Sequence, residues 1–342
     1  MNYIGSKYSI LSYIDEVIED FTKAKKNLVF CDIFAGTGVV SKYFKEKGYN
    51  IIANDIQYFS YVMLKGLIET SDELKFEKLA KKHIDPFACL NGLNGKKGFI
   101  YKNYSKEGTS KKQFERQYFS GENAKKIDAI RMKIEKWKKK KLIDENEYFY
   151  LLACLIEASD KVANTASVYE AFLKDLKKSA QKKLIVEPLE LVFKNKIYKV
   201  YNKDSKDLIK EINGDILYLD PPYNSRKYDT NYHILETISL YDNPKIKGKT
   251  GIRIDDSKKS NYCVKGKAAL ELEDLIKNAK FKYILLSYND EGIISPDEIK
   301  SIMSKYGTYK KYEKKHKRFK SDNSRDYKKD YTIEYIHCLE KQ

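Results

Sequence analysis

Residues 28–38 read Leu-Val-Phe-Cys-Asp-Ile-Phe-Ala-Gly-Thr-Gly, and this stretch determines the class of fold. Its first seven residues are almost all apolar, which predicts a buried strand at 28–34. Gly36 and Gly38 follow at once and favour a tight turn in which a ligand can approach the backbone. An amphipathic segment at 39–47 predicts that a helix leaves this turn.

The next segments complete a strand–helix–strand unit. Gly48 is expected to end the helix, and residues 50–54 predict a second strand with Asp55 at its end. A dinucleotide-binding turn would carry a third glycine, but Ser41 occupies that position. An acid at the end of the second strand can accept hydrogen bonds from both ribose hydroxyls. These features predict a nucleoside-containing cofactor without a pyrophosphate, although Asp55 could also be an ordinary loop or capping acid.

The sheet is predicted to be split by a long helical region. Apolar residues recur at helical spacing over 8–26, and the chain from about residue 59 to 196 is mostly helical in pattern, including a long helical pattern at 145–180. Strands are expected again at 197–202, 215–219 and 281–287, with a final antiparallel hairpin at 306–314 and 331–339. We therefore predict an α/β, Rossmann-like catalytic domain formed by residues 1–65 and 196–342. A mostly helical insertion at 66–195 would interrupt it.

Composition narrows the class of protein. The chain has 342 residues, 42% of them hydrophobic, which suits a globular protein with a full core. It has no apolar run long enough to span a membrane, and its N-terminus lacks a signal-peptide core. The five cysteines are scattered and the four histidines are isolated, so we expect no metal site and no disulfide framework. Such cysteine usage fits a reducing cytoplasm.

The net charge of +17 favours a polyanionic partner, and nucleic acid is the usual one. Only six of the 66 basic residues are arginine, however, and the chain is rich in Lys, Asn, Ile and Tyr. That bias is also typical of an AT-rich genome, in which many lysines simply solvate helix faces. In the insertion, the run Lys138–Lys141 and the alternation of aromatic and basic residues over 99–119 are the candidate contacts to nucleic acid.

The strand predicted at 215–219 runs directly into Asp220-Pro221-Pro222-Tyr223. This sequence offers a carboxylate, a carbonyl whose backbone is fixed by two prolines, and an aromatic face. A planar base that carries an exocyclic amino group can donate to both acceptors and stack on the ring. The same four residues could instead be a turn that stops a strand, so their reading depends on the motifs that accompany them.

Two further segments are ambiguous when taken alone. Residues 2–7 read Asn-Tyr-Ile-Gly-Ser-Lys ahead of the first helix, where Ser6 could be a helix cap. Residues 200–204 read Val-Tyr-Asn-Lys-Asp, a strand that ends in Asp204 before a helix. That acid could cap the helix or contact a ligand.

Taken in order, these motifs resemble a known family. The Tyr-Ile-Gly-Ser-Lys motif at 3–7, Asp-x-Phe-x-Gly-x-Gly at 32–38, a strand-end acid, a long insertion and Asp-Pro-Pro-Tyr are similar to the D12 class of DNA adenine-N6 methyltransferases, which is Dam-like in motif order. The extended strings at 220–228 and 160–169 resemble the FokI-type modification enzymes more closely. The resemblance covers both parts of the sheet domain and part of the insertion.

The resemblance implies S-adenosylmethionine as cofactor and double-stranded DNA as partner. The implied cofactor contacts are Tyr3, Lys7, Asp32, Phe34, Gly36, Gly38, Asp55 and Asp204. Tyr3 and Lys7 would line the methionine side of the pocket, Asp55 would hold the ribose, and Asp204 would lie beside the cofactor adenine. Asp220, Pro221, Pro222 and Tyr223 would hold the target adenine.

The DNA is expected to meet three parts of the chain. The implied contacts just after the catalytic motif are Arg226, Lys227 and Tyr228. A basic loop at 314–329 is a second candidate, and the insertion is the candidate target recognition domain because reading several base pairs needs additional surface. A cognate restriction endonuclease that acts separately is a possible further partner, and the sequence predicts no oligomeric state.

Two alternatives stay open at this point. An N4-cytosine DNA methyltransferase acts on a similar amino group, but that group usually has Ser in place of Asp220. A methyltransferase-like subunit could bind DNA without catalysis, which the intact Asp220, Tyr223, Gly36 and Gly38 argue against.

Overall fold

A computed structural model of the 342-residue chain describes residues 5–23, 28–223, 228–254, 260–317 and 331–342. The chain folds into two compact units. The helical unit comprises Met1–Ser6, Gln57–Phe193 and Tyr228–Ser257, and the sheet unit comprises Lys7–Ile56, Lys194–Lys227 and Lys258–Gln342. No helix within the described ranges is long and apolar enough to cross a membrane.

The sheet unit is built on seven strands in the order β3-β2-β1-β4-β7-β9-β8. Their bounds are β1 Val29–Asp32, β2 Asn50–Asn54, β3 Tyr198–Tyr201, β4 Asn213–Leu219, β7 Lys280–Asn289, β8 Gly307–Lys317 and β9 Tyr331–Lys341. The first five strands in this order are parallel, while β9 pairs antiparallel with both β7 and β8. The predicted α/β fold with a final antiparallel hairpin is therefore confirmed.

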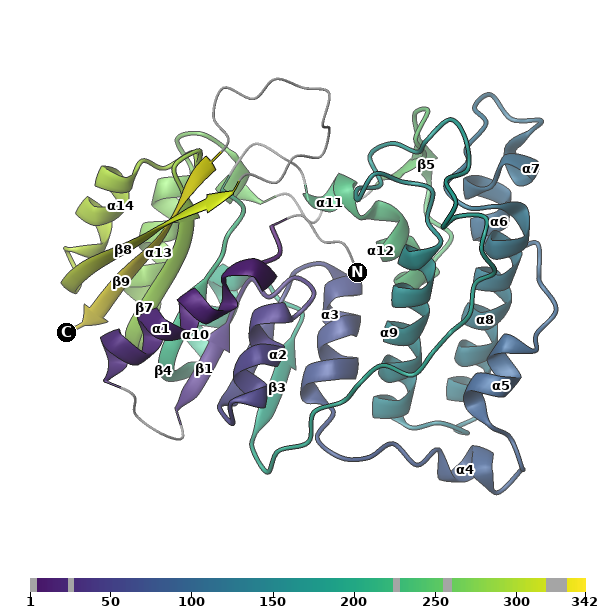
Figure 1. Ribbon diagram of the computed structural model, residues 1–342, viewed down its shortest axis with the longest axis horizontal. Helices are drawn as coiled ribbons and strands as arrows, with labels where there is room; N and C mark the ends of the chain where they lie inside the picture. The colour runs from purple at the N-terminus through teal and green to yellow at the C-terminus, as the bar shows by residue number, and fades with distance from the viewer. Residues whose placement is uncertain (1–4, 24–27, 224–227, 255–259, 318–330) are drawn as a thin grey trace. The chain divides into compact units, whose positions relative to one another are not determined.

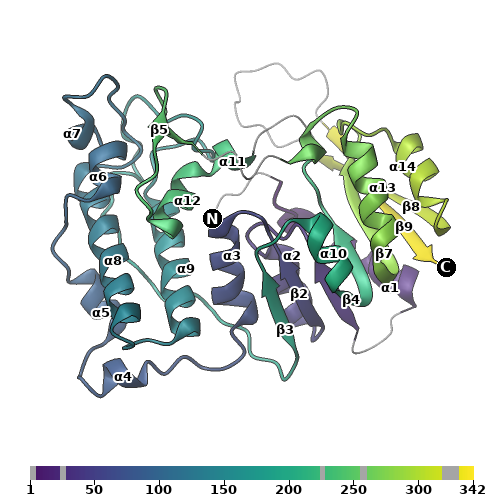
Figure 2. The same ribbon diagram turned by 180° about the vertical axis from the view of Figure 1, so that it is seen from behind.

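Helices cover both faces of this sheet. They are α1 Leu11–Thr22, α2 Val39–Glu46, α10 Ser205–Glu211, α13 Ala268–Asn278 and α14 Pro296–Met303. The first two lie on the face turned to the viewer in Figure 1, and α10 and α13 lie on the opposite face, which Figure 2 shows. Apolar residues of α10, α13 and α14 pack with β4 and β7 into one buried cluster. Parallel strands buried on both faces explain the nearly continuous apolar runs in the sequence.

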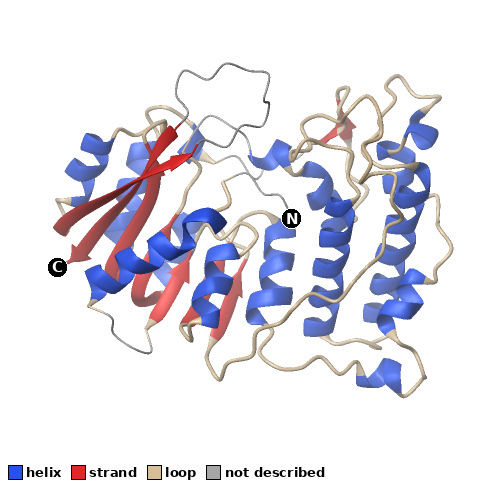
Figure 3. Cartoon of the chain, viewed as in Figure 1, coloured by secondary structure: helices blue, strands red, loops and turns tan. Residues whose placement is uncertain are grey.

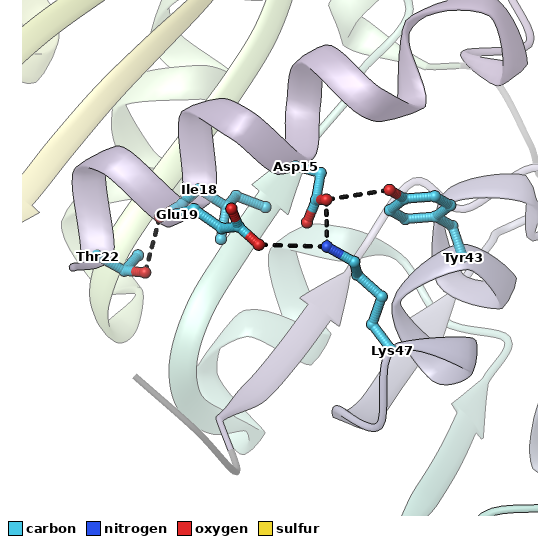
Figure 4. A network of polar contacts seen from close by, with 6 residues as sticks. All are labelled: Asp15, Ile18, Glu19, Thr22, Tyr43 and Lys47. Atoms are coloured by element: carbon cyan, nitrogen blue, oxygen red, sulfur yellow. Dashed lines mark hydrogen bonds and ion pairs between the residues drawn. The ribbon is translucent and has the colours of Figure 1, made fainter. Parts of the chain in front are cut away.

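A polar network joins the first helix of the sheet unit to the helix that follows the glycine turn. Lys47 Nζ contacts the Asp15 carboxylate and lies 3.3 Å from Glu19 Oε1 (Figure 4). The hydroxyl of Tyr43 also donates to Asp15, at 3.0 Å. These contacts tie α1 to α2, so the segment that begins at Lys7 is fixed relative to the glycine turn.

The helical unit contains the longer helices of the chain (Figure 3). Its helices are α3 Tyr58–Leu64, α4 Glu77–Ala80, α5 Pro86–Asn91, α6 Phe99–Tyr104, α7 Lys106–Thr109, α8 Gly121–Lys139, α9 Glu145–Lys161, α11 Tyr228–Asn231 and α12 His233–Leu240, with a π-helical turn at Lys65–Glu69. The small hairpin β5 Ile246–Lys247 and β6 Ile252–Arg253 also belongs to it. Its core is a separate cluster around α8, α9 and α12.

The helical unit differs from the sequence-based expectation in its bounds. Its longest segment begins at Gln57 rather than at residue 66, and it includes Tyr228–Ser257, which the sequence placed with the sheet. The helix expected over 145–180 ends at Lys161. Asn164 explains the end, because its side-chain amide donates to the carbonyls of Gln117 and Leu173 and holds the chain in a loop.

The stretch in which aromatic and basic residues alternate contributes several of its rings to the core. It contains the short helices α6 and α7 besides loops. Tyr104, Tyr118 and Phe119 are fully buried, and the Tyr104 and Tyr118 hydroxyls donate to the carbonyls of Gly251 and Tyr169. These three rings belong to the core, whereas Phe99, Tyr101 and Phe114 are partly exposed, so the contact of this stretch with DNA stays a prediction.

Candidate active site

The predicted cofactor and catalytic motifs of the sheet unit lie at the carboxyl ends of adjacent strands. β1 pairs with β2 on one side and with β4 on the other, and Asp32 of β1 lies opposite Tyr218 of β4. The chain thus leaves β1 and β4 toward opposite halves of the sheet. Such a switch point is where open α/β sheets form their ligand sites.

The turn after β1 has the backbone conformation that glycine permits. Gly36 has φ +53° and Gly38 has φ +80°, both in the left-handed region. The Gly36 amide donates to the Asp55 carboxylate at 2.8 Å, so the acid at the end of β2 holds the turn at the end of β1. The structure thereby brings together three of the predicted cofactor residues.

Asp32 ends β1 and is 1% exposed. The Ser41 hydroxyl donates to its carboxylate at 2.8 Å. Burial raises the pKa of Asp32 to about 7, since the hydrogen bond from Ser41 only partly offsets it and the nearby acids Asp220 and Asp55 raise it further. Ser41 is thus a partner that sequence reasoning missed, since the sequence marked it only as the place of an absent glycine.

Phe34 and Asp204 lie at the other predicted cofactor positions of this unit. The Phe34 ring is half-buried and meets the Tyr262 ring edge-on, with centroids 5.2 Å apart. Asp204 is exposed and caps α10, where its carboxylate accepts the Lys206 amide at 2.9 Å. Asp204 is therefore a helix cap in the structure, and its contact with the cofactor adenine stays a prediction.

The motif after β4 is anchored through its backbone and its ring. The Tyr223 carbonyl accepts the Ile293 amide at 2.8 Å. The Tyr223 ring packs edge-on against Tyr288, with centroids 5.7 Å apart and planes at 66°. Pro221 is buried, while Pro222 and Tyr223 are partly exposed, so the ring keeps some exposed surface.

Lys7 contacts the catalytic motif, whereas the sequence predicted a contact with the cofactor. Its side chain is 6% exposed, and its Nζ lies 3.2 Å from Asp220 Oδ1 and 3.7 Å from Glu334 Oε2. It also lies 5.3 Å from the centroid of the Tyr223 ring. The structure therefore places Lys7 beside the catalytic motif, and its predicted contact with the cofactor stays a prediction.

These contacts set the protonation of both partners. Burial alone would lower the pKa of Lys7, but the carboxylates of Asp220 and Glu334 outweigh it and hold that pKa well above the ordinary value of 10.5. Burial raises the pKa of Asp220 to about 6, with Lys7 lowering it and Glu334 raising it. Asp220 is consequently ionised at neutral pH and can accept a hydrogen from an amino group.

Sequence reasoning also missed Glu334. It lies on β9 opposite Asn289 of β7, and it is 8% exposed. Its strand neighbours on the same side, Ile336 and Cys338, are fully buried. The strand is buried on both sides over residues 335–339, and Glu340 lies on the same side as Glu334, so alternation in the sequence gives no signal that identifies Glu334.

Three predicted contacts lie outside the described residues, namely Tyr3, Arg226 and Lys227. Tyr228 begins α11 in the helical unit. Their proposed contacts with cofactor and DNA stay predictions.

The fold and this cluster define an α/β enzyme of the methyltransferase class, and comparison with known proteins identifies the family. Residues 3–302 match the D12 class N6 adenine-specific DNA methyltransferases. The chain belongs to this family. The family match favours adenine N6 over the N4-cytosine alternative.

Several curated relatives are similar over most of the chain. The type II methyltransferase M.NlaIII of Neisseria lactamica is 46% identical over 100% of this chain and 99% of its own length. M.FokI of Planomicrobium okeanokoites is 41% identical over 100% of this chain and 53% of its own length. The modification methylase StsI of Streptococcus sanguinis is 39% identical over 92% of this chain and 49% of its own length. The chain thus spans nearly the whole of one relative and about half of the other two.

Proposed function

We propose that this protein transfers a methyl group from S-adenosylmethionine to N6 of an adenine flipped out of duplex DNA, using the motif from Asp220 to Tyr223. The observation that carries the proposal is the geometry at the end of β4, where the Asp220 carboxylate lies 3.2 Å from the Lys7 ammonium and the Tyr223 ring lies next to that ammonium. An acceptor and a stacking face at one strand end suit a base with an amino group.

The end of β1 fits the cofactor in shape and charge. The glycine turn leaves backbone open to close approach, and Asp32 and Asp55 place two acidic side chains next to it. Acidic groups suit a ligand that carries a sulfonium and an ammonium. S-adenosylmethionine supplies a methyl group that its sulfonium already activates, so the protein needs only to bind and align the reactants.

The residues after β4 would then act on the adenine. Asp220 would accept a hydrogen bond from N6 and stabilise the positive charge that develops there as the nitrogen–carbon bond forms and the sulfur–carbon bond of the donor breaks, leaving its electron pair on sulfur. The carboxylate is then the nearest acceptor for the proton that N6 must lose. The carbonyl of Pro221, fixed by the proline backbone, offers a second acceptor for the amino group. Tyr223 provides a face on which the base stacks, which offsets part of the cost of removing it from the duplex.

We further propose that the helical insertion at 66–195 selects the target sequence. The chain at the end of α8 presents four exposed lysines, Lys138 to Lys141, and the Nζ of Lys138 lies 3.8 Å from the centroid of the Tyr148 ring. Replacing Lys138 to Lys141 with glutamine should flatten the salt dependence of DNA binding if these lysines contact phosphate. An unchanged slope would assign them to solvation of the helix end, where cations are favourable in any case.

The relatives support a place in a restriction-modification system. Two of them are named type II methyltransferases and a third a modification methylase. We propose that this chain protects DNA from a cognate endonuclease that acts as a separate protein.

Mapping of modified bases tests the proposed reaction. Unmethylated DNA incubated with the protein and S-adenosylmethionine should acquire N6-methyladenine at one recurrent short sequence. N4-methylcytosine in its place would establish the cytosine alternative. Cofactor binding without any DNA modification would establish the inactive subunit.

A further inference from the structure

Glu334 has no role in the reaction described so far, yet it shares a buried cation with the catalytic acid. Lys7 Nζ lies between the two carboxylates, 3.2 Å from Asp220 and 3.7 Å from Glu334. The exposed fractions of the three side chains are 6% for Lys7, 18% for Asp220 and 10% for Glu334. A charged strand residue at such a depth is costly unless it is paired, so its presence calls for a partner, and Lys7 is that partner.

We propose that Glu334 is a positioning residue that divides the positive charge of Lys7 between two carboxylates. Lys7 then keeps Asp220 ionised and oriented, while Glu334 prevents Lys7 from binding Asp220 so tightly that the acid becomes a poor acceptor. This inference rests on the proposed function, because it assigns Glu334 a part in the reaction of Asp220.

The other charged and titratable groups around the cluster are consistent with this division. Tyr218 and Tyr223 also face Lys7, and Asp32 faces Asp220 from the end of β1. On β9, Glu334 lies opposite Asn289 of β7 and Lys314 of β8 in the sheet register. Lys7 is the cation in direct contact with Asp220 among the described ion pairs, so the balance between Lys7 and Glu334 sets the state of that acid.

The proposal predicts that loss of Glu334 and loss of Lys7 change the pH at which Asp220 ionises in opposite directions. Without Glu334, the whole charge of Lys7 acts on Asp220, so the acid ionises at lower pH and accepts more weakly. Without Lys7, burial and the charge of Glu334 act unopposed, so the acid ionises only at higher pH. A purely structural role for Glu334 would lower the amount of folded protein but would not move a titration.

The pH dependence of kcat, at saturating cofactor and duplex DNA, measures this directly. For Glu334→Gln we expect the acid limb of the pH–kcat profile to move down by about one pH unit. We expect kcat at neutral pH to fall by a factor of about 3, because the transition state feels only part of the lost basicity. For Lys7→Met we expect the limb to move up by about one unit or more. The pH at the midpoint of this limb does not depend on the fraction of protein that is active. A variant that is only partly folded therefore still gives an interpretable midpoint.

Glu340→Gln is the matched control. Glu340 lies on the same strand and loses the same kind of ion pair, with Lys282 at 3.1 Å, but on the surface and away from Lys7. Its limb should stay at the wild-type position. An unmoved limb in Glu334→Gln, or the same shift in both glutamine variants, would overturn the proposal. If Glu334→Gln does not fold, a downward or absent shift in Lys7→Met would overturn it instead.

The experiment distinguishes failure of the Glu334 proposal from failure of the proposed function. Wild-type protein that forms no N6-methyladenine would refute the proposed reaction. Wild-type protein that forms it normally, together with an unmoved limb in Glu334→Gln, would refute only the role of Glu334.

Discussion

Two neighbouring strands of the sheet each lead into an acid, one fully buried and one partly exposed, and the two acids are held in different ways. Asp32 at the end of β1 is bonded by Ser41, a hydroxyl nine residues later on the helix that follows. Asp220 after β4 is paired with Lys7, a cation from the other end of the sequence. The first acid has a pKa raised to about 7 and the second to about 6.

The difference separates binding from transfer. The partner of Asp32 is a neutral hydroxyl, which leaves the carboxylate free to attract a cationic ligand. The partner of Asp220 is an ammonium, which stabilises the ionised carboxylate and suits an acid that must accept a hydrogen bond in every cycle. We therefore expect substitutions at the end of β1 to change cofactor affinity, and substitutions at the end of β4 to change the rate of transfer.

The largest effect is expected from Asp220→Ala. Loss of the acceptor should reduce kcat on the order of 10³-fold, because it removes the group that stabilises charge on N6. Cofactor affinity, measured by calorimetry, should be retained. A variant that loses cofactor binding but keeps its rate would reverse the assignment of the two strand ends.

Tyr223→Ala should have the next largest effect. Stacking of a base on an aromatic ring contributes on the order of 1–3 kcal/mol, so turnover should fall by roughly 5- to 150-fold. Tyr223→Phe keeps the ring and should keep most of the activity, which steady-state kinetics on duplex DNA would show. Equal rates for Tyr223→Ala and wild type would mean that the target base is held elsewhere.

Asp55→Ala tests the proposed cofactor site at the end of β1. It removes the proposed ribose acceptor and the partner of the Gly36 amide, so S-adenosylmethionine affinity should fall by on the order of 1–3 kcal/mol. With saturating cofactor, kcat should be close to that of wild type. Unchanged affinity would place the ribose away from this strand end.

Asp32→Asn is expected to change stability rather than turnover. Since the folded pKa of about 7 lies above the ordinary value of 3.8, ionisation of Asp32 destabilises the folded chain. That penalty is absent below about pH 4, grows as the pH rises and is complete above about pH 7. The melting temperature of Asp32→Asn relative to wild type should therefore be higher at pH 8 than at pH 5, and a difference that is independent of pH would contradict the shift.

The sequence was sufficient for the parts of the site whose partners are local. The strand, the glycine turn and Asp55 follow from apolar runs and from glycine at fixed spacing, and β2 has the predicted bounds of 50–54. The contact between Lys7, Asp220 and Glu334 joins three distant segments, and spacing carries no information about such a contact. The sheet order that brings β4 and β9 to either side of β7 had to be seen in the structure.

The helical unit shows a second feature that sequence patterns could not predict. Tyr104, Tyr118 and Phe119 alternate with basic residues in a way that also fits a nucleic-acid surface, yet they are fully buried. An aromatic ring packs equally well on a base and in a core, so composition could not distinguish the two. The extent of the helix from Glu145 depended on the hydrogen bonds of Asn164, which no periodicity reveals.

The most direct test of the central claim is transfer of a labelled methyl group to unmethylated duplex DNA, followed by identification of the modified nucleoside, for wild type and Asp220→Ala at equal cofactor occupancy. Our account predicts that wild type labels N6-methyladenine and that Asp220→Ala, with its cofactor bound, labels almost none. Label on another nucleoside, or wild-type labelling by Asp220→Ala, would contradict it.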